Sequence, residues 1–251
     1  QRQMCIRDRP EAPPASGWQA TAGVAIVCQV PEILAQLRVG DRVFIDDGKL
    51  AAAVESADAG GAWLRVARAG PKGWKPKSEK GLNFPDTALA IDALTAKDLA
   101  DLPHALELAD LIGYSFVQNA ADIRSLQEAM AAIMPTSWQE VPLVAKIETP
   151  RAIIIVAAAG RQPMAVMIAR GDLAVEIGFE RLAEMQEEVM WLSEAAHVPV
   201  IWATQVLEQL VKRGLPSRGE MTDAAMAVRA EAVMLNKGRS WSRVSAPSID
   251  C

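Results

Sequence analysis

An apolar run that ends in two charged residues, Pro142-Leu143-Val144-Ala145-Lys146-Ile147-Glu148, decides the fold of this chain. A short run of this kind is typical of a buried strand. Residues two apart on a strand point to the same face, so Lys146 and Glu148 are presented side by side where the strand ends. The plainer alternative is a structural salt bridge between Lys146 and an acid, which by itself contributes little.

Four further apolar runs also end at a polar residue, and the intervals between these residues are regular. The separations are 31, 26, 32 and 32 residues, which is about one strand–helix unit each. Apolar residues at helical spacing fill the intervals, and the capping boxes Thr95-x-x-Asp98 and Ser217-x-x-Glu220 predict helix starts. Alternating strands and helices predict a parallel sheet with crossover connections. The five polar residues are Ser115, Lys146, Asp172, Thr204 and Asn236.

These units predict an α/β fold, namely a partial (β/α)₈ TIM barrel with a small β-rich lid domain. Residues 85–238 have room for about five βα units, fewer than a complete barrel needs. The carboxyl ends of barrel strands meet at one face, and that face holds the active site. The polar strand ends are therefore expected in one place, unless they are polar only because chains turn polar where strands end.

Outside the predicted barrel we expect three segments. Residues 18–84 contain short apolar runs joined by tight turns such as Asp46-Asp47-Gly48, which predicts a small antiparallel lid (B) domain. Residues 1–17 and 239–251 have neither a helical nor a strand period. We expect both to be artefactual or disordered tails, and we assign no function to them.

Composition excludes several classes of function. The net charge of −5 lacks the basic footprint of a nucleic-acid partner. The aliphatic run 152–159 is far shorter than the roughly 20 residues that cross a bilayer, so no membrane contact is expected. No Cys-x-x-Cys pair and no P-loop are present, and a reduced, cytoplasmic setting is expected. Two histidines, His104 and His197, are interpreted as structural or surface residues.

Oxygen-bearing side chains at successive strand ends predict a metal and anion site. Glu148 and Asp172 are a carboxylate pair suited to Mg²⁺ or Mn²⁺, which take oxygen ligands. Gly171 lets backbone approach a ligand, and its N–H with that of Asp172 can receive a carboxylate or phosphate. Thr204 offers a hydroxyl that can bind a substrate carboxylate or relay a proton, unless it is an ordinary threonine at a strand end.

Several motifs, in a fixed order, resemble the pyruvate kinase family. The stretch Val39-Gly40-Asp41-Arg42-Val43-Phe44-Ile45-Asp46-Asp47-Gly48-Lys49 is similar to the opening of that family's lid, and Lys80-Gly81-Leu82-Asn83-Phe84-Pro85 to the return into its barrel. The resemblance covers residues from about 18 to 238. The barrel motifs that carry it are Ser115-Phe116-Val117, Lys146-Ile147-Glu148, Ala169-Arg170-Gly171-Asp172-Leu173, Ala203-Thr204-Gln205 and Met234-Leu235.

The resemblance implies phosphoryl transfer from phosphoenolpyruvate to ADP, giving pyruvate and ATP in glycolysis. It implies that Lys146 contacts the transferring phosphoryl group and stabilises the enolate, and that Thr204 lies near the proton that the enolate receives. Gly171, Asp172 and Thr204 would bind phosphoenolpyruvate with Lys146. Mg²⁺ or Mn²⁺ would be held by Glu148 and Asp172, and Lys80 would reach the nucleotide phosphates from the lid.

The chain also departs from the family pattern. The Arg-x-Asn-x-Ser strand and the Asp-Thr-Lys-Gly-Pro segment are absent, so the K⁺ ligands that the family implies are not in this chain. Asn236-Lys237-Gly238 replaces the more common small polar ending of the last strand. Trp202 and the stretch Trp191 to Val200 resemble an atypical bacterial or plastid-like branch. We expect a fragment that lacks the first barrel strands and the C-terminal domain of a homo-oligomeric parent. The alternatives are a catalytically incompetent fragment and a Mg²⁺-dependent pyruvate-enolate aldolase of the same superfamily.

Overall fold

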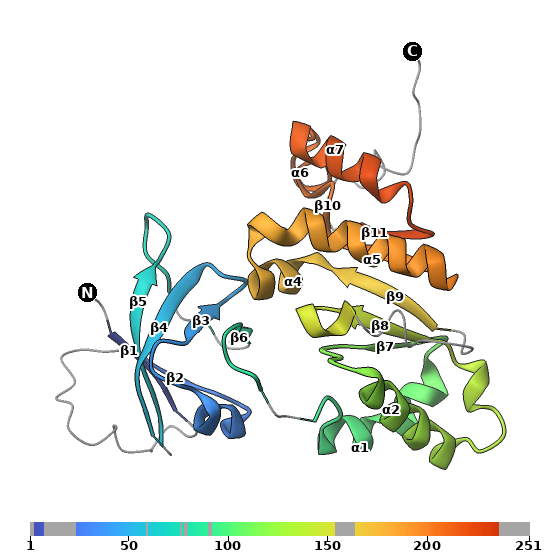
Figure 1. Cartoon of the computed structure of the whole chain (residues 1–251), viewed down its shortest axis with the longest axis horizontal. Coiled ribbons are helices and arrows are strands. Elements are labelled where there is room, and N and C mark those ends of the chain that lie inside the picture. The colour runs from blue at the N-terminus through green and yellow to red at the C-terminus, as the bar shows by residue number, and fades with distance from the viewer. Residues whose placement is uncertain are drawn as a thin grey trace. The chain divides into compact units, whose positions relative to one another are not determined.

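The computed structural model describes residues 3–7, 24–58, 60–75, 77, 80–89, 92–153 and 164–235. The chain divides into two compact units, residues 1–91 and 92–251 (Figure 1). The sequence placed the boundary at residue 84, seven residues earlier. Phe84 is buried in the core of the N-terminal unit, which explains why this unit extends past the expected boundary.

A six-stranded sheet forms the N-terminal unit. β3 (Arg42–Ile45), β4 (Leu50–Asp58) and β5 (Gly61–Arg68) form an antiparallel meander. The first five residues of β4 alternate between buried and partly exposed, as a sheet with one covered face requires. A short 3₁₀ helix, Pro31–Gln36, buries Ile33 and Leu34 in the same core. The strands, in sheet order, are β2 (Val24–Val27), β1 (Gln3–Arg7), β5 (Gly61–Arg68), β4 (Leu50–Asp58), β3 (Arg42–Ile45) and β6 (Leu82–Asn83).

The turn between β3 and β4 has an unusual backbone. Asp46, Asp47 and Gly48 all have positive φ, at 56°, 56° and 75°. Aspartate tolerates the left-handed region better than most residues, and glycine adopts it freely. The Asp-Asp-Gly sequence that predicted a turn is therefore the chemistry that this backbone needs.

The N-terminal residues differ from the expected unstructured tail. Gln3–Arg7 form strand β1, which pairs in parallel with β2 and antiparallel with β5. Met4 and Ile6 are buried in the core of this unit. A five-residue strand with two inward side chains is too short for its period of two to stand out in the sequence, so the tail prediction is wrong for these residues.

Five parallel strands form the sheet of the C-terminal unit, and they lie in the order in which they occur along the chain (Figure 1). This arrangement confirms the predicted α/β class with a parallel sheet. One strand is shorter than expected, because the run from Leu111 to Val117 is extended only as far as Tyr114. The strands are β7 (Ile112–Tyr114), β8 (Leu143–Ile147), β9 (Met164–Ala169), β10 (Val200–Val206) and β11 (Ala232–Leu235).

Helices alternate with these strands, and among the helices that the structure describes three begin at a complete capping box. Thr95 and Ser217 cap their helices as the sequence predicted, and Asn119 makes a third box with Asp122. The helices are α1 (Ala96–Leu108), α2 (Ala120–Ile133), α4 (Arg170–Ile177), α5 (Leu182–Ala196), α6 (Glu208–Arg213) and α7 (Arg218–Ala227), with 3₁₀ turns at Trp138–Glu140, Pro150–Ala152 and Phe179–Arg181.

One apolar core joins the sheet and its helices. It includes Ile147, Ile168 and Trp202 from three neighbouring strands, all fully buried, with Leu126 from α2 and Val189 from α5. Burial of both sheet faces explains the continuous apolar runs in the sequence. Among the described helices, none is long and apolar enough to span a membrane. Asn236 and the expected tail 239–251 lie outside the described residues.

Candidate active site at the carboxyl ends of the strands

Lys146 and Glu148 form an ion pair at the carboxyl end of β8. Lys146 Nζ lies 2.6 Å from Glu148 Oε1 and donates a hydrogen bond of 2.9 Å to Ser115 Oγ, which follows β7. The side chain of Glu148 is 1% exposed, whereas that of Lys146 is 28% exposed. The carboxylate is thus the buried partner, and the ammonium group is the one that a ligand can approach.

Backbone geometry after β7 completes the environment of Glu148. Phe116 has a positive φ of 52°, and its N–H donates to Glu148 Oε2 at 2.6 Å. A buried carboxylate is tolerated when opposite charge and hydrogen bonds satisfy its oxygens. Ser115 and Phe116 therefore hold the pair together from the neighbouring strand end.

A second contact lies at the ends of β9 and β10. Gly171 N–H donates a hydrogen bond of 2.8 Å to Thr204 Oγ1. This contact uses the hydroxyl oxygen as an acceptor and leaves its hydrogen available to a ligand or water. The Gly171 N–H is engaged, so an anion that binds this amide would have to displace Thr204 from it.

Gly171 lies in the first turn of α4, because the helix begins directly after β9. A Cβ added at Gly171 would meet Thr204 Oγ1 at 3.6 Å, an ordinary van der Waals contact. The fold itself therefore does not demand glycine at this position. Asp172 follows in the same turn, where a negative side chain is favoured by the helix dipole.

Arg170 connects the ends of β9, β10 and α7. Its Nε donates to the Ala203 carbonyl at 3.0 Å, one Nη donates to the Thr204 carbonyl, and the other pairs with Asp223. The guanidinium carbon lies 5.0 Å from the ring centroid of Trp202. At 7% exposure this arginine is buried, and its charge is satisfied on all sides.

Metal binding at this edge would rest on few ligands. Among the residues the structure describes, no group of three or more histidine, cysteine or carboxylate side chains could hold a metal ion. Glu148 and Asp172 supply two carboxylates from successive βα units. Mg²⁺ commonly takes one or two carboxylates and completes its shell with water and substrate phosphates. The number and type of donors suit such an ion, but the buried oxygens of Glu148 already accept from Lys146 Nζ and Phe116 N–H, so an ion would have to compete with these partners.

The predicted nucleotide ligand Lys80 lies in the N-terminal unit. Its Nζ lies 3.0 Å from Asp46 Oδ1, as does Lys49 Nζ, and Trp74 Nε1 donates to Asp46 Oδ2 at 3.4 Å. Burial alone would raise the pKa of Asp46, but the two ammonium groups and the indole outweigh it and lower the pKa to about 2. Asp46 therefore stays ionised and holds Lys80 near the β3–β4 turn.

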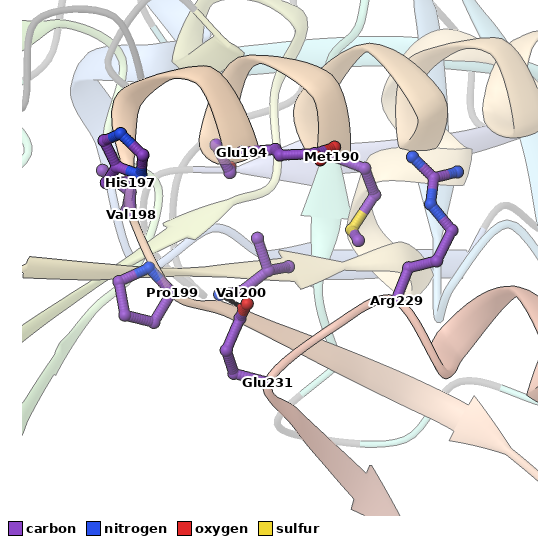
Figure 2. Close-up of a pocket in the computed structure, with 9 residues that line it drawn as sticks. Met190, Glu194, His197, Val198, Pro199, Val200, Arg229 and Glu231 are labelled. Carbon is purple, nitrogen blue, oxygen red and sulfur yellow. Dashed lines mark hydrogen bonds between the residues drawn. The ribbon is translucent and has the colours of Figure 1, made fainter.

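A surface pocket of the C-terminal unit lies away from these residues. Its volume is about 470 Å³, and it opens beside the last turns of α5 and the start of β10 (Figure 2). Val200 lines it, and Thr204 is four residues further along β10, a distance of about 13 Å on a strand. The pocket is therefore at the amino ends of the strands, opposite to the candidate site. The lining includes Met190, Ser193, Glu194, His197, Arg229 and Glu231.

Two residues of this site carried no assigned role from sequence alone. Arg170 was noted only as part of Arg-Gly-Asp, although an arginine directly after an apolar strand is a recognisable signal of a buried, paired cation. Asp223 lies in the second turn of α7, and no local pattern links it to a residue that is 53 positions away.

An α/β chain with a parallel sheet, and with a lysine, two carboxylates and a hydroxyl near the carboxyl ends of its strands, has the arrangement typical of barrel enzymes, whose active sites lie at that face. Sequence comparison is more specific. A family model described as "Pyruvate kinase, barrel domain" matches residues 17–241. The chain therefore belongs to the pyruvate kinase family.

Individual relatives agree with this assignment. The chain is 36% identical over 202 residues to a pyruvate kinase of Corynebacterium efficiens, covering 79% of this chain and 41% of that protein. It is 36% identical over 200 residues to a pyruvate kinase of Mycobacterium tuberculosis, and this match covers 78% of this chain and 41% of that protein. It is 39% identical over 213 residues to a pyruvate kinase of Agrobacterium vitis, and this match covers 82% of this chain and 42% of that protein. The chain thus spans about two fifths of the length of these relatives.

Proposed function

We propose that the full-length protein carrying this chain transfers the phosphoryl group of phosphoenolpyruvate to ADP. The bond between phosphorus and the enol oxygen of phosphoenolpyruvate breaks, and a terminal phosphate oxygen of ADP forms a new bond to that phosphorus. The enolate that remains takes up one proton at its methylene carbon and becomes pyruvate. The observation that carries the proposal is the ammonium group of Lys146, held at the strand ends by Ser115 and Glu148.

Lys146 supplies positive charge where negative charge develops. Its Nζ is fixed by two partners before any substrate binds, so little reorganisation is needed during the reaction. The ammonium group contacts the transferring phosphoryl group and then stabilises the enolate oxygen. Phosphoryl transfer depends mainly on positioning and on such electrostatic stabilisation.

Thr204 and Gly171 orient the three-carbon substrate. The Thr204 hydroxyl oxygen accepts from Gly171 N–H, which holds the oxygen in place and leaves the hydroxyl hydrogen free to donate. That hydrogen bonds to the substrate carboxylate or to a water that delivers the proton to the enolate. Asp172 adds a negative group beside them, and Lys80 of the N-terminal unit takes the nucleotide phosphates.

Glu148 and Asp172 would hold Mg²⁺ or Mn²⁺. When bound, such an ion would supply positive charge that offsets the negative charge of the substrate phosphates. A K⁺ ion, a glycolytic role in the cytoplasm and a homo-oligomeric assembly belong to the same proposal. They are supported by membership of the family rather than by a contact in this chain.

A coupled assay for pyruvate tests the proposal. The full-length protein is mixed with phosphoenolpyruvate, ADP, Mg²⁺ and K⁺, and we expect pyruvate and ATP in equal amounts. Formation of neither product would contradict the proposal. Release of pyruvate from an aldol substrate without any ADP-dependent reaction would favour the aldolase alternative instead.

A further inference from the structure

We propose that Arg170 is a positioning residue, which sets the geometry of Thr204 and Gly171 by holding two consecutive carbonyl groups of β10. It does not reach the reacting atoms itself. The inference rests on the proposed function because its main test measures the turnover of phosphoenolpyruvate. The contacts from which we argue it all lie within the C-terminal unit.

The segment that Arg170 holds is irregular. Between Trp202 and Val206, β10 has three residues opposite one residue of β11, so the ladder is interrupted there. Thr204 and Gln205 both have positive φ, at 64° and 55°. A β-branched residue such as threonine rarely adopts this region, and it persists only where surrounding contacts impose it.

Arg170, the first residue of α4, supplies those contacts. The guanidinium group donates to the carbonyls of Ala203 and Thr204, where the ladder between β10 and β11 is interrupted. Its planar fork reaches both carbonyls at once. The backbone of Thr204 is therefore fixed on one side by Arg170, and its side chain is fixed on the other by Gly171 N–H.

Two further contacts hold Arg170 in place. Asp223 of α7 pairs with one end of the guanidinium group. The guanidinium carbon also lies over the fully buried Trp202 ring, 5.0 Å from the ring centroid. The arginine thus cannot change rotamer without losing a buried ion pair. Because Arg170 and Gly171 are consecutive, a shift of this arginine also moves the amide that binds the Thr204 hydroxyl.

A double-mutant cycle on the full-length protein tests the inference. We expect Arg170→Lys to lower kcat by about 10–100-fold, since misplacing a substrate-positioning group by about 1 Å has effects of this size. The KM for ADP should change by less than about twofold. Thr204→Ala lowers kcat on its own, and adding Arg170→Lys to it should lower kcat by less than about threefold more, because residues acting through one group are not additive.

The controls separate a positioning role from a general structural one. Arg229→Lys alters an arginine that pairs with Glu187 near the opposite pocket (Figure 2), and it should leave kcat unchanged. Should Arg170→Lys fail to fold, Asp223→Asn replaces it, and the same lack of additivity with Thr204→Ala is expected. Normal kcat in Arg170→Lys, or effects that multiply fully in the double mutant, would overturn the inference.

Failure of the proposed function gives a different result. If the wild-type protein does not convert phosphoenolpyruvate and ADP, the proposed function is wrong, and amide hydrogen exchange decides the inference instead. Exchange of the Gly171 amide should become more than about tenfold faster in Arg170→Lys and stay unchanged in Arg229→Lys. Unchanged exchange in Arg170→Lys would overturn the role of this arginine.

Discussion

At the scale of single residues, the site depends on pairs in which one member is buried and the other faces outward. Glu148 is almost fully buried and Lys146 is not, so the carboxylate fixes the cation. Removing one partner of such a pair leaves an uncompensated buried charge, which typically costs about 3–5 kcal/mol. Variants of Lys146 therefore need a check of folding as well as of activity.

Gly171→Ala tests whether glycine at this position serves substrate binding or the stability of the fold. The added methyl group makes only ordinary contact with Thr204, and alanine is favoured over glycine in a helix by about 0.5–1 kcal/mol. We expect unchanged or slightly raised thermal stability together with an increase of at least about tenfold in the KM for phosphoenolpyruvate. A variant with lower stability and normal KM would contradict the assignment of Gly171 to the substrate site.

Asp172→Ala tests the metal assignment. We expect the affinity of the full-length protein for Mn²⁺, measured by titration calorimetry, to fall by about 100-fold or more, because even indirect partners of metal ligands contribute about 10–100-fold. Asp110→Ala is a matched control, since Asp110 is an exposed aspartate just before β7, at the amino ends of the strands. Unchanged affinity in Asp172→Ala would remove this residue from the metal site.

At the scale of elements, the strand ends and turns carry the chemistry, and the sequence predicted them unevenly. Capping boxes at Thr95 and Ser217 and the long apolar periods of α2 and α5 are local signals, so these helices were predictable. The interrupted end of β10 was not, because its contacts come from Arg170 in the first turn of α4, which is more than 30 residues away in the sequence. The strand β1 was missed for a different reason, because a period of two cannot be recognised reliably over only five residues.

The candidate site was predictable as a set of residue types but not as a set of contacts. Lys146 and Glu148 are two apart on one strand, and this spacing alone implied that they lie together. The contact of Gly171 with Thr204 joins residues 33 positions apart, and it depends on the neighbouring order of β9 and β10. Asp223 joins the site only through the packing of α7, which no local pattern encodes.

The β3–β4 turn should make the N-terminal unit sensitive to acid. The folded-state pKa of Asp46 is about 2, below its ordinary value of 3.8. Its contribution to stability is therefore present above about pH 4 and is lost as the pH falls through about 2. We expect Asp46→Asn to lower the free energy of unfolding at pH 7 by roughly 1–2 kcal/mol. In urea titrations, this difference from wild type should shrink towards zero near pH 2, and a difference independent of pH would contradict the assignment.

At the scale of the whole molecule, the parallel sheet has two outer strands, β7 and β11, each with one neighbour among the described residues. All four residues of β11 are exposed. Exposed strand edges offer unpaired backbone groups to other chains. We expect the 251-residue chain alone to convert phosphoenolpyruvate and ADP at least about 100-fold more slowly than the full-length protein, because it spans only about two fifths of the length of its pyruvate kinase relatives. Equal turnover per molecule in the pyruvate assay would contradict this expectation.

The central claim is that Lys146 stabilises the charge that develops during phosphoryl transfer. The most direct measurement is the turnover of phosphoenolpyruvate and ADP by full-length wild type and Lys146→Met, each first shown to be folded by its thermal melting curve. One lost contact of this kind typically costs about 3–4 kcal/mol of transition-state stabilisation. We therefore expect kcat to fall by about 10²–10³-fold in Lys146→Met, while Mn²⁺ still binds. Near-normal turnover in a folded Lys146→Met protein would contradict it.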